Sequence, residues 1–151
     1  MSKRNKTTIR EPIAIIGLGG CFPGASNIET YWKNICEGKS AIREVPAQRW
    51  NSADYYSKIK TEPDKTYSKI GGFLDEVPFE SKRFRIPPKT AKFVDNVQKL
   101  ALTAVADALE DADLQLRQDA TTGRSFDRER TAVILGNSMG GEFEDKTNLR
   151  V

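Results

Sequence analysis

The stretch that decides the fold is Ile13-Ala14-Ile15-Ile16-Gly17-Leu18-Gly19, an apolar run in which polar residues do not alternate. Such a run is typical of a strand that is buried on both faces, as in a parallel sheet. The turn Gly19-Gly20-Cys21-Phe22-Pro23-Gly24 follows it. A helix comes next, because Ser26 and Glu29 have the spacing of a capping box and Gly38 is a typical helix end. The sequence therefore predicts a strand–turn–helix unit.

A second run of the same kind lies near the other end of the sequence. Thr131-Ala132-Val133-Ile134-Leu135-Gly136 predicts another buried strand, followed by a glycine-rich turn over residues 137–141. Between the two runs, the longest helical pattern spans about Asn96 to Ala112, with Asp95 as its predicted N-cap and many alanines in its apolar stripe. We expect an α/β fold in which both strands share one sheet and this helix packs against them.

The remaining elements have weaker signals. Ile42-Arg43-Glu44-Val45-Pro46 predicts a short edge segment, and Tyr67–Leu74 predicts a short strand. The pair Gly71-Gly72 inside that strand indicates a bend or a close approach of another backbone. Pro87-Pro88 opens a short helical turn that reaches Phe93.

Composition excludes several classes of protein. The chain has 151 residues, of which 38% are hydrophobic and 30% charged, as is typical of a soluble globular protein and not of a disordered one. No apolar run approaches the roughly 20 residues that a membrane span needs, and no secretory signal is present. We therefore expect a cytoplasmic protein with no membrane span. Histidine is absent, which excludes a Ser-His-Asp triad, a Cys-His pair or a His-ligated zinc within this chain alone.

The net charge of +3 comes from one end of the chain. Lys3, Arg4, Lys6 and Arg10 lie in the first ten residues, and the remainder carries twenty basic and twenty-one acidic side chains. Residues 1–11 are therefore predicted to be a disordered basic leader, and residues 12–151 the folded part. A nucleic-acid partner is not expected, because the folded part has no basic excess.

Glycines and cysteines near the first strand offer candidate sites, but none of them is complete. Gly17-Leu18-Gly19-Gly20 is similar to a dinucleotide-binding turn, yet Phe22 stands where that motif needs its third glycine. A tight turn out of a buried strand is the better interpretation. Cys21 has only apolar or glycine neighbours and no base or cation that would lower its pKa, and Cys36 lies on the apolar side of the predicted helix, so we interpret both as packed, reduced thiols. The sequence predicts no metal site.

Several segments, taken together and in order, resemble the opening of β-ketoacyl synthase domains. The resemblance extends over roughly residues 11–141 and is greatest to condensing domains of polyketide, polyunsaturated-fatty-acid and glycolipid synthases. It is carried by Pro12–Gly19, Phe22-Pro23-Gly24, Tyr31-Trp32, Val45–Trp50, Tyr55-Tyr56, Gly71–Leu74, Ile86-Pro87-Pro88 and Ala108–Ala112.

The resemblance implies that residues 12–151 are the N-terminal portion of a thiolase-like fold, incomplete in this chain. It implies a condensing enzyme that elongates acyl chains by decarboxylative Claisen condensation, with malonyl delivered on the phosphopantetheine arm of an acyl carrier protein. The acyl-bearing Cys and two assisting His residues are expected beyond Val151, so no catalytic residue is assigned here and the chain alone is expected to be inactive. The full-length protein is expected to be a homodimer, and no cofactor is expected to bind this chain.

The same resemblance assigns substrate-binding residues. Met139 and Gly140 match the turn that faces the acyl pocket in the family, and Met139 would gate entry of the acyl chain. Alternatively, Met139 fills the base of the turn or a dimer contact. Two other functions stay open from the sequence: a non-catalytic module for dimerisation or carrier-protein docking, and a small α/β nucleotide binder.

Overall fold

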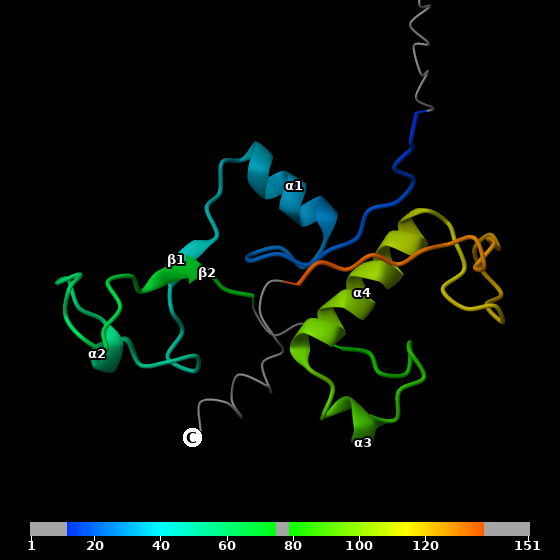
Figure 1. Cartoon of the computed structure of the whole chain (residues 1–151). Coiled ribbons are helices and arrows are strands. Elements are labelled where there is room, and N and C mark those ends of the chain that lie inside the picture. The colour runs from blue at the N-terminus through cyan, green and yellow to red at the C-terminus, as the bar shows by residue number, and fades with distance from the viewer. Residues whose placement is uncertain (1–11, 75–78, 138–151) are drawn as a thin grey trace, which may run out of the picture.

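The computed structural model describes residues 12–74 and 79–137 (Figure 1). Figure 1 shows α4 on one side of the molecule and the small β1–β2 sheet with α2 on the other, with α3 near the beginning of α4. The elements in chain order are α1 (Ile28–Cys36), β1 (Ile42–Glu44), α2 (Ser52–Tyr55), β2 (Ile70–Gly72), α3 (Pro88–Ala91) and α4 (Asn96–Asp111).

The predicted long helix is confirmed as α4. Asp95 is its N-cap, and the Asp95 carboxylate accepts a hydrogen bond of 2.9 Å from the backbone N–H of Val97. This bond satisfies one of the amides that the first turn leaves without a helical partner. Within α4 only Ala106 is fully buried, with 1% of its surface exposed.

Helix α1 is also confirmed, but its predicted cap is wrong by one residue. The side chain of Asn27, not that of Ser26, accepts a 2.8 Å hydrogen bond from the N–H of Thr30. Asn27 has the extended backbone that an N-cap needs, with φ −153° and ψ 170°. At the other end Gly38 has a φ of +63°, the left-handed conformation that ends many helices.

The two weakly predicted strands pair to form a small sheet. β1 and β2 pair in antiparallel register, with Ile42 opposite Gly72 and Glu44 opposite Ile70. A Cβ at Gly72 would lie 3.1 Å from Cγ of Pro23, so the glycine lets the turn after residue 20 approach the sheet closely. The neighbour is a proline side chain and not the backbone that the sequence suggested.

The prediction of two buried strands is wrong. Residues 13–19 and 131–136 are extended but belong to no strand, and Ile13 and Ile134 are 95% and 92% exposed. An extended segment becomes a strand only where a neighbour offers N–H and C=O groups in register. Within residues 12–74 and 79–137, no segment offers such a ladder to either run.

The core of the described part is small. Its buried apolar residues are Ala25, Val45, Ala106 and Ala112, and the bulky residues Trp32 and Ile35 on α1 are at least half exposed. Cys36, predicted to be a core thiol, is exposed because no described element packs on the side of α1 that carries it. Among the described residues, no helix is both long and apolar enough to cross a membrane.

Candidate functional site

The turn Gly17-Leu18-Gly19-Gly20, which is similar to a dinucleotide-binding turn in sequence, contacts α4 through two of its glycines. A Cβ at Gly17 would lie 2.2 Å from the carbonyl oxygen of Ala108, and a Cβ at Gly19 would lie 2.3 Å from that of Ala104. Real side chains do not approach backbone this closely, so both positions require glycine. The sequence interpretation of these glycines as structural agrees with this contact, although the segment is not a strand.

Carboxylates on α4 hold two other segments against the helix. Asp111 accepts a 2.9 Å hydrogen bond from the backbone N–H of Leu18. Arg83 places its two terminal nitrogens 2.9 Å from carboxylate oxygens of Asp107 and Glu110, which lie three residues apart on the helix. The two carboxylates are visible in the sequence as an i, i+3 pair, but nothing in the sequence pattern identifies Arg83 as their partner.

Cys21 directly follows the glycines of this turn and is half-buried. Burial, and then the negative charge of Asp107, raises the pKa of the thiol above its ordinary value of 9.0. The thiol therefore stays protonated near neutral pH, whereas a nucleophilic cysteine needs a lowered pKa. This agrees with the interpretation of Cys21 as a packed thiol.

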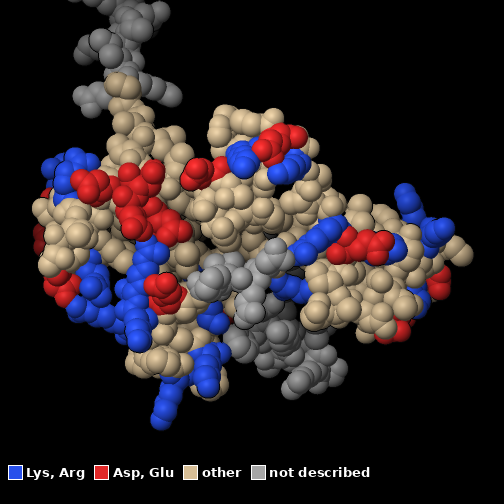
Figure 2. Space-filling model, turned by 180° about the vertical axis from the view of Figure 1, so that it is seen from behind, with Lys and Arg blue, Asp and Glu red and all other residues tan. Residues whose placement is uncertain are grey.

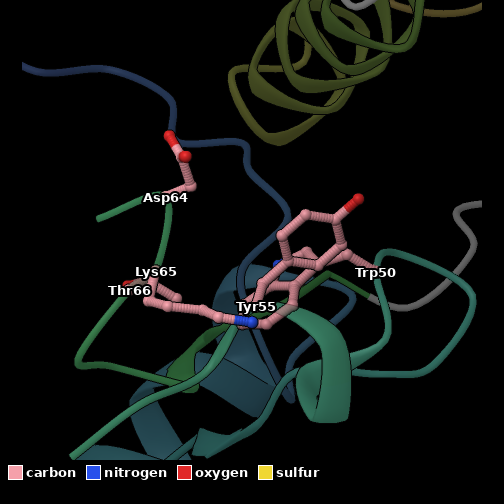
Figure 3. Close-up of a pocket in the computed structure, with 5 residues that line it drawn as sticks. All are labelled: Trp50, Tyr55, Asp64, Lys65 and Thr66. Carbon is pink, nitrogen blue, oxygen red and sulfur yellow. The ribbon is translucent and has the colours of Figure 1, made fainter. Parts of the chain in front are cut away.

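A shallow, open recess of about 540 Å³ lies on the side of the molecule that carries α2 (Figure 3). The Trp50 and Tyr55 rings meet edge to face in it, 6.2 Å apart, and the ammonium of Lys65 donates to the backbone carbonyl of Asp54. Figure 3 shows the carboxylate of Asp64 pointing away from the aromatic pair. The recess therefore brings together no nucleophile and base. Its lining residues are Trp50, Tyr55, Asp64, Lys65 and Thr66.

The substrate-binding residues expected from the sequence, Met139 and Gly140, lie outside the described residues, so their role stays a prediction. The described chain ends just before them at residue 137. In the part of the chain that the structure describes, no three His, Cys, Asp or Glu side chains gather to hold a metal ion. Over residues 12–74 and 79–137, the geometry therefore shows a framework of helices and a small sheet and no assembled catalytic site.

Comparison with known proteins identifies the family of this chain. Residues 10–150 match the family model described as beta-ketoacyl synthase, N-terminal domain. The chain belongs to this family. Curated β-ketoacyl synthase relatives include Polyketide synthase PksL of Bacillus subtilis, 41% identical over 138 residues, or 91% of this chain and 3% of that protein. Polyketide synthase ThaG of Burkholderia thailandensis is 41% identical over 103 residues, or 68% of this chain and 2% of that protein.

Solved ketosynthase domains share the fold. The oxazolomycin ketosynthase domain of Streptomyces albus JA3453 superposes with a TM-score of 0.59 at 34% identity, covering 64% of this chain and 17% of that one. A ketosynthase from module 6 of the Bacillus subtilis bacillaene synthase gives 0.58 at 36% identity, covering 64% and 16%. The fold prediction is confirmed: the chain is a portion of the thiolase-like ketosynthase fold.

Proposed function

We propose that this chain is the N-terminal part of a ketosynthase that elongates acyl chains in a cytoplasmic, homodimeric synthase. The family match over residues 10–150 carries the proposal. Because this chain has no histidine, the two His residues that the reaction needs would lie elsewhere in the protein. The acyl-bearing Cys and both His would come from sequence that follows Val151.

The proposed reaction has two steps. In the first, the acyl group moves from a carrier thiol to the Cys thiol, and one thioester replaces another. In the second, malonyl on the phosphopantetheine arm of an acyl carrier protein loses CO2. The resulting carbanion attacks the acyl carbonyl, forms the new C–C bond and releases the Cys thiol. This chain would contribute the α4 framework and the turn at Met139, and it binds no cofactor of its own in this proposal.

A chimera tests the proposal directly. Residues 12–151 would replace the matching segment in the ketosynthase domain of PksL, to which the chain is 41% identical. We expect the chimera to condense acyl and malonyl thioesters and the 151-residue chain alone to form no product, as measured by mass spectrometry. A folded but inactive chimera would contradict the proposal, as would product from the isolated chain that persists after Cys21→Ala. The latter outcome would favour a different enzyme over both a fragment and a non-catalytic docking module.

The proposed role of Met139 has its own test. An unbranched thioether between glycines can adapt to acyl chains of different length. In the chimera, Met139→Trp should block long acyl primers and spare acetyl, while the volume-conserving Met139→Leu should spare both. Equal losses for acetyl and long primers, or a lowered melting temperature, would show that Met139 fills the base of the turn.

A further inference from the structure

The recess beside α2 has the size and the aromatic lining of a small-molecule site. We call it the Trp50 recess, and it is lined by Trp50, Tyr55, Asp64, Lys65 and Thr66. Its volume of about 540 Å³ is typical of pockets that hold small ligands. The planes of the Trp50 and Tyr55 rings cross at 84° (Figure 3). In such an edge-to-face pair, the ring that presents its edge keeps both flat faces free of that contact.

The loop over residues 57–66, which supplies one side of the Trp50 recess, is closed by its own hydrogen bonds. The backbone N–H of Thr66 donates to the carbonyl of Tyr55 at 2.7 Å, and the N–H of Ser57 donates to the carbonyl of Thr66 at 2.9 Å. Within the loop, the hydroxyl of Ser57 donates to the carboxylate of Glu62. These bonds tie both ends of the loop to the end of α2, so the recess is formed before any ligand arrives. A preformed site loses little conformational freedom on binding.

The residues that line the Trp50 recess offer mainly hydrogen-bond donors. Neither the indole N–H of Trp50 nor the hydroxyl of Tyr55 bonds to any residue that the structure describes. The ammonium of Lys65 donates to the backbone carbonyl of Asp54, which is neutral and leaves the positive charge of the lysine uncompensated. The carboxylate of Asp64 points away from the rings (Figure 3). A ligand that fits this recess therefore carries hydrogen-bond acceptors and a negative charge.

The positive charge at the Trp50 recess is local. Residues 54–65 carry three basic and three acidic side chains. Figure 2, which shows the molecule from behind, has blue and red side chains interspersed at the end that carries α2 and the small sheet. A large polyanion therefore meets no broad field of one sign, whereas a small anion beside Lys65 meets one cation at close range.

We infer that the Trp50 recess binds a small, planar carboxylate with an aromatic or unsaturated body. The body lies against the Trp50 and Tyr55 rings, and the carboxylate accepts from the ammonium of Lys65. A phosphate is the poorer match, because phosphates favour the bidentate fork of arginine and no arginine lines the recess. The recess has no part in the condensation proposed above, so the inference goes beyond the proposed function.

The indole N–H signals of the two tryptophans test the inference by NMR in the 151-residue chain. The probe is trans-cinnamate, which should shift the Trp50 signal and saturate with a Kd on the order of 1 mM, because a shallow recess covers only part of the ligand. Trp32 lies in α1, outside the recess, and its signal is the internal control that should not move. Cinnamamide has nearly the same shape without the charge and should bind about fivefold more weakly or worse.

Variants of the lining residues identify the group that holds the carboxylate. Lys65→Met keeps an apolar stem and removes the ammonium, so it should weaken cinnamate binding about fivefold and leave cinnamamide binding unchanged. Lys58→Met makes the same charge change in the same loop, outside the recess, and should leave both unchanged. Lys65→Arg keeps the charge and should keep most of the affinity for cinnamate, which decides the case if Lys65→Met disturbs the loop. Tyr55→Leu should weaken the binding of both probes.

Three results would overturn the inference. Equal shifts of the Trp32 and Trp50 signals would show that cinnamate binds without preference for the recess. Equal affinities for cinnamate and cinnamamide, or equal effects of Lys58→Met and Lys65→Met, would show that Lys65 does not hold a carboxylate. Tighter binding of a short neutral proline peptide would make the recess a peptide surface, since aromatic recesses also bind extended proline segments. An inactive chimera would contradict the proposed function alone, because no step of this test uses condensation.

Discussion

The two kinds of extended segment in this molecule behave in opposite ways. Residues 13–19 and 131–136 have the apolar pattern of buried strands, yet neither forms a ladder and both are largely exposed. β1 and β2 are only three residues long, with exposed or half-exposed residues, yet they pair in clear register. An apolar pattern therefore reports the surroundings that a segment needs, whereas strand formation depends on a partner backbone being present.

The two regions are also held in place by different interactions. Gly17 and Gly19 lie so close to the backbone of α4 that neither position has room for a side chain. The β1–β2 unit is held by its own hydrogen bonds and by a side-chain contact with Pro23. Substitutions in the first region should therefore cost more stability than those in the second.

The largest effect is expected at Gly19. Gly19→Ala would place a methyl group 2.3 Å from the carbonyl oxygen of Ala104 and 2.4 Å from the amide nitrogen of Ala108. We expect a loss of about 3 kcal/mol in the free energy of unfolding, measured in urea. The loss arises because the backbone of this segment or of α4 must move to make room for the methyl group. Gly136→Ala is the matched control, since its Cβ would meet no atom within 4 Å. A similar loss for both variants would show that the contact with α4 is not what holds the segment.

A smaller loss is expected from the ion pairs. Arg83→Leu removes two charge-assisted hydrogen bonds to α4 and should cost about 1–2 kcal/mol, because the arginine is about 29% exposed and its carboxylates are more so. Lys69→Leu removes the ion pair to Glu44 and the contact of the ammonium with the Tyr56 ring beside the sheet, and it should cost less than Arg83→Leu because Lys69 is more solvated. If Lys69→Leu lowered the free energy of unfolding more than Arg83→Leu at low salt, the ion pairs would not distinguish the two regions.

Gly72 in β2 should tolerate a side chain better than Gly19 does. The methyl group of Gly72→Ala would lie 3.1 Å from Cγ of Pro23, which can move by a few tenths of an ångström. The reduced freedom of the unfolded chain offsets part of this strain, so we expect a change within about 1 kcal/mol in urea unfolding. A loss as large as that of Gly19→Ala would show that the turn and the sheet are as rigidly packed as the α4 contact.

The smallest effect on stability is expected for Cys36→Ser, within about 0.5 kcal/mol, because the side chain is exposed. The two thiols should nevertheless differ in alkylation by iodoacetamide, followed by mass spectrometry. The raised pKa of Cys21 reduces its thiolate fraction, so it should react more slowly than Cys36. The contribution of Cys21 to stability should be present below pH 9.0 and lost as the pH rises through its folded-state pKa. Faster alkylation of Cys21 would contradict the packed environment.

The sequence predicted local structure well and long-range structure poorly. The N-cap Asp95 and the end of α1 at Gly38 depend on neighbours a few residues away, and both are confirmed. The contacts of Arg83 with α4 depend on residues more than twenty positions away, which no periodicity encodes. The prediction of two buried strands was wrong for the same reason, since a ladder depends on partner backbone that the run itself does not specify.

The expected substrate-binding residues also could not be derived from a local sequence pattern. Met139 and Gly140 were assigned through resemblance, and the physical chemistry of the turn only agrees with that role. The family assignment succeeded because it used many short segments in order, including Phe22-Pro23-Gly24 and Gly71–Leu74, each of them uninformative alone. An ordered set of segments specifies long-range arrangement in a way that a single periodic pattern does not.

The close packing of Gly17 and Gly19 against the backbone of α4 has a geometric consequence. Two residues of extended chain advance about 6.6 Å, and four residues of α-helix advance about 6.0 Å, so the two repeats are nearly commensurate. This is why successive glycines meet Ala108 and then Ala104, one helical turn apart. The mismatch of about 0.6 Å per step accumulates, so a glycine zipper of this kind stays in register for only a few steps. Lengthening it would require the chain to bend around the helix.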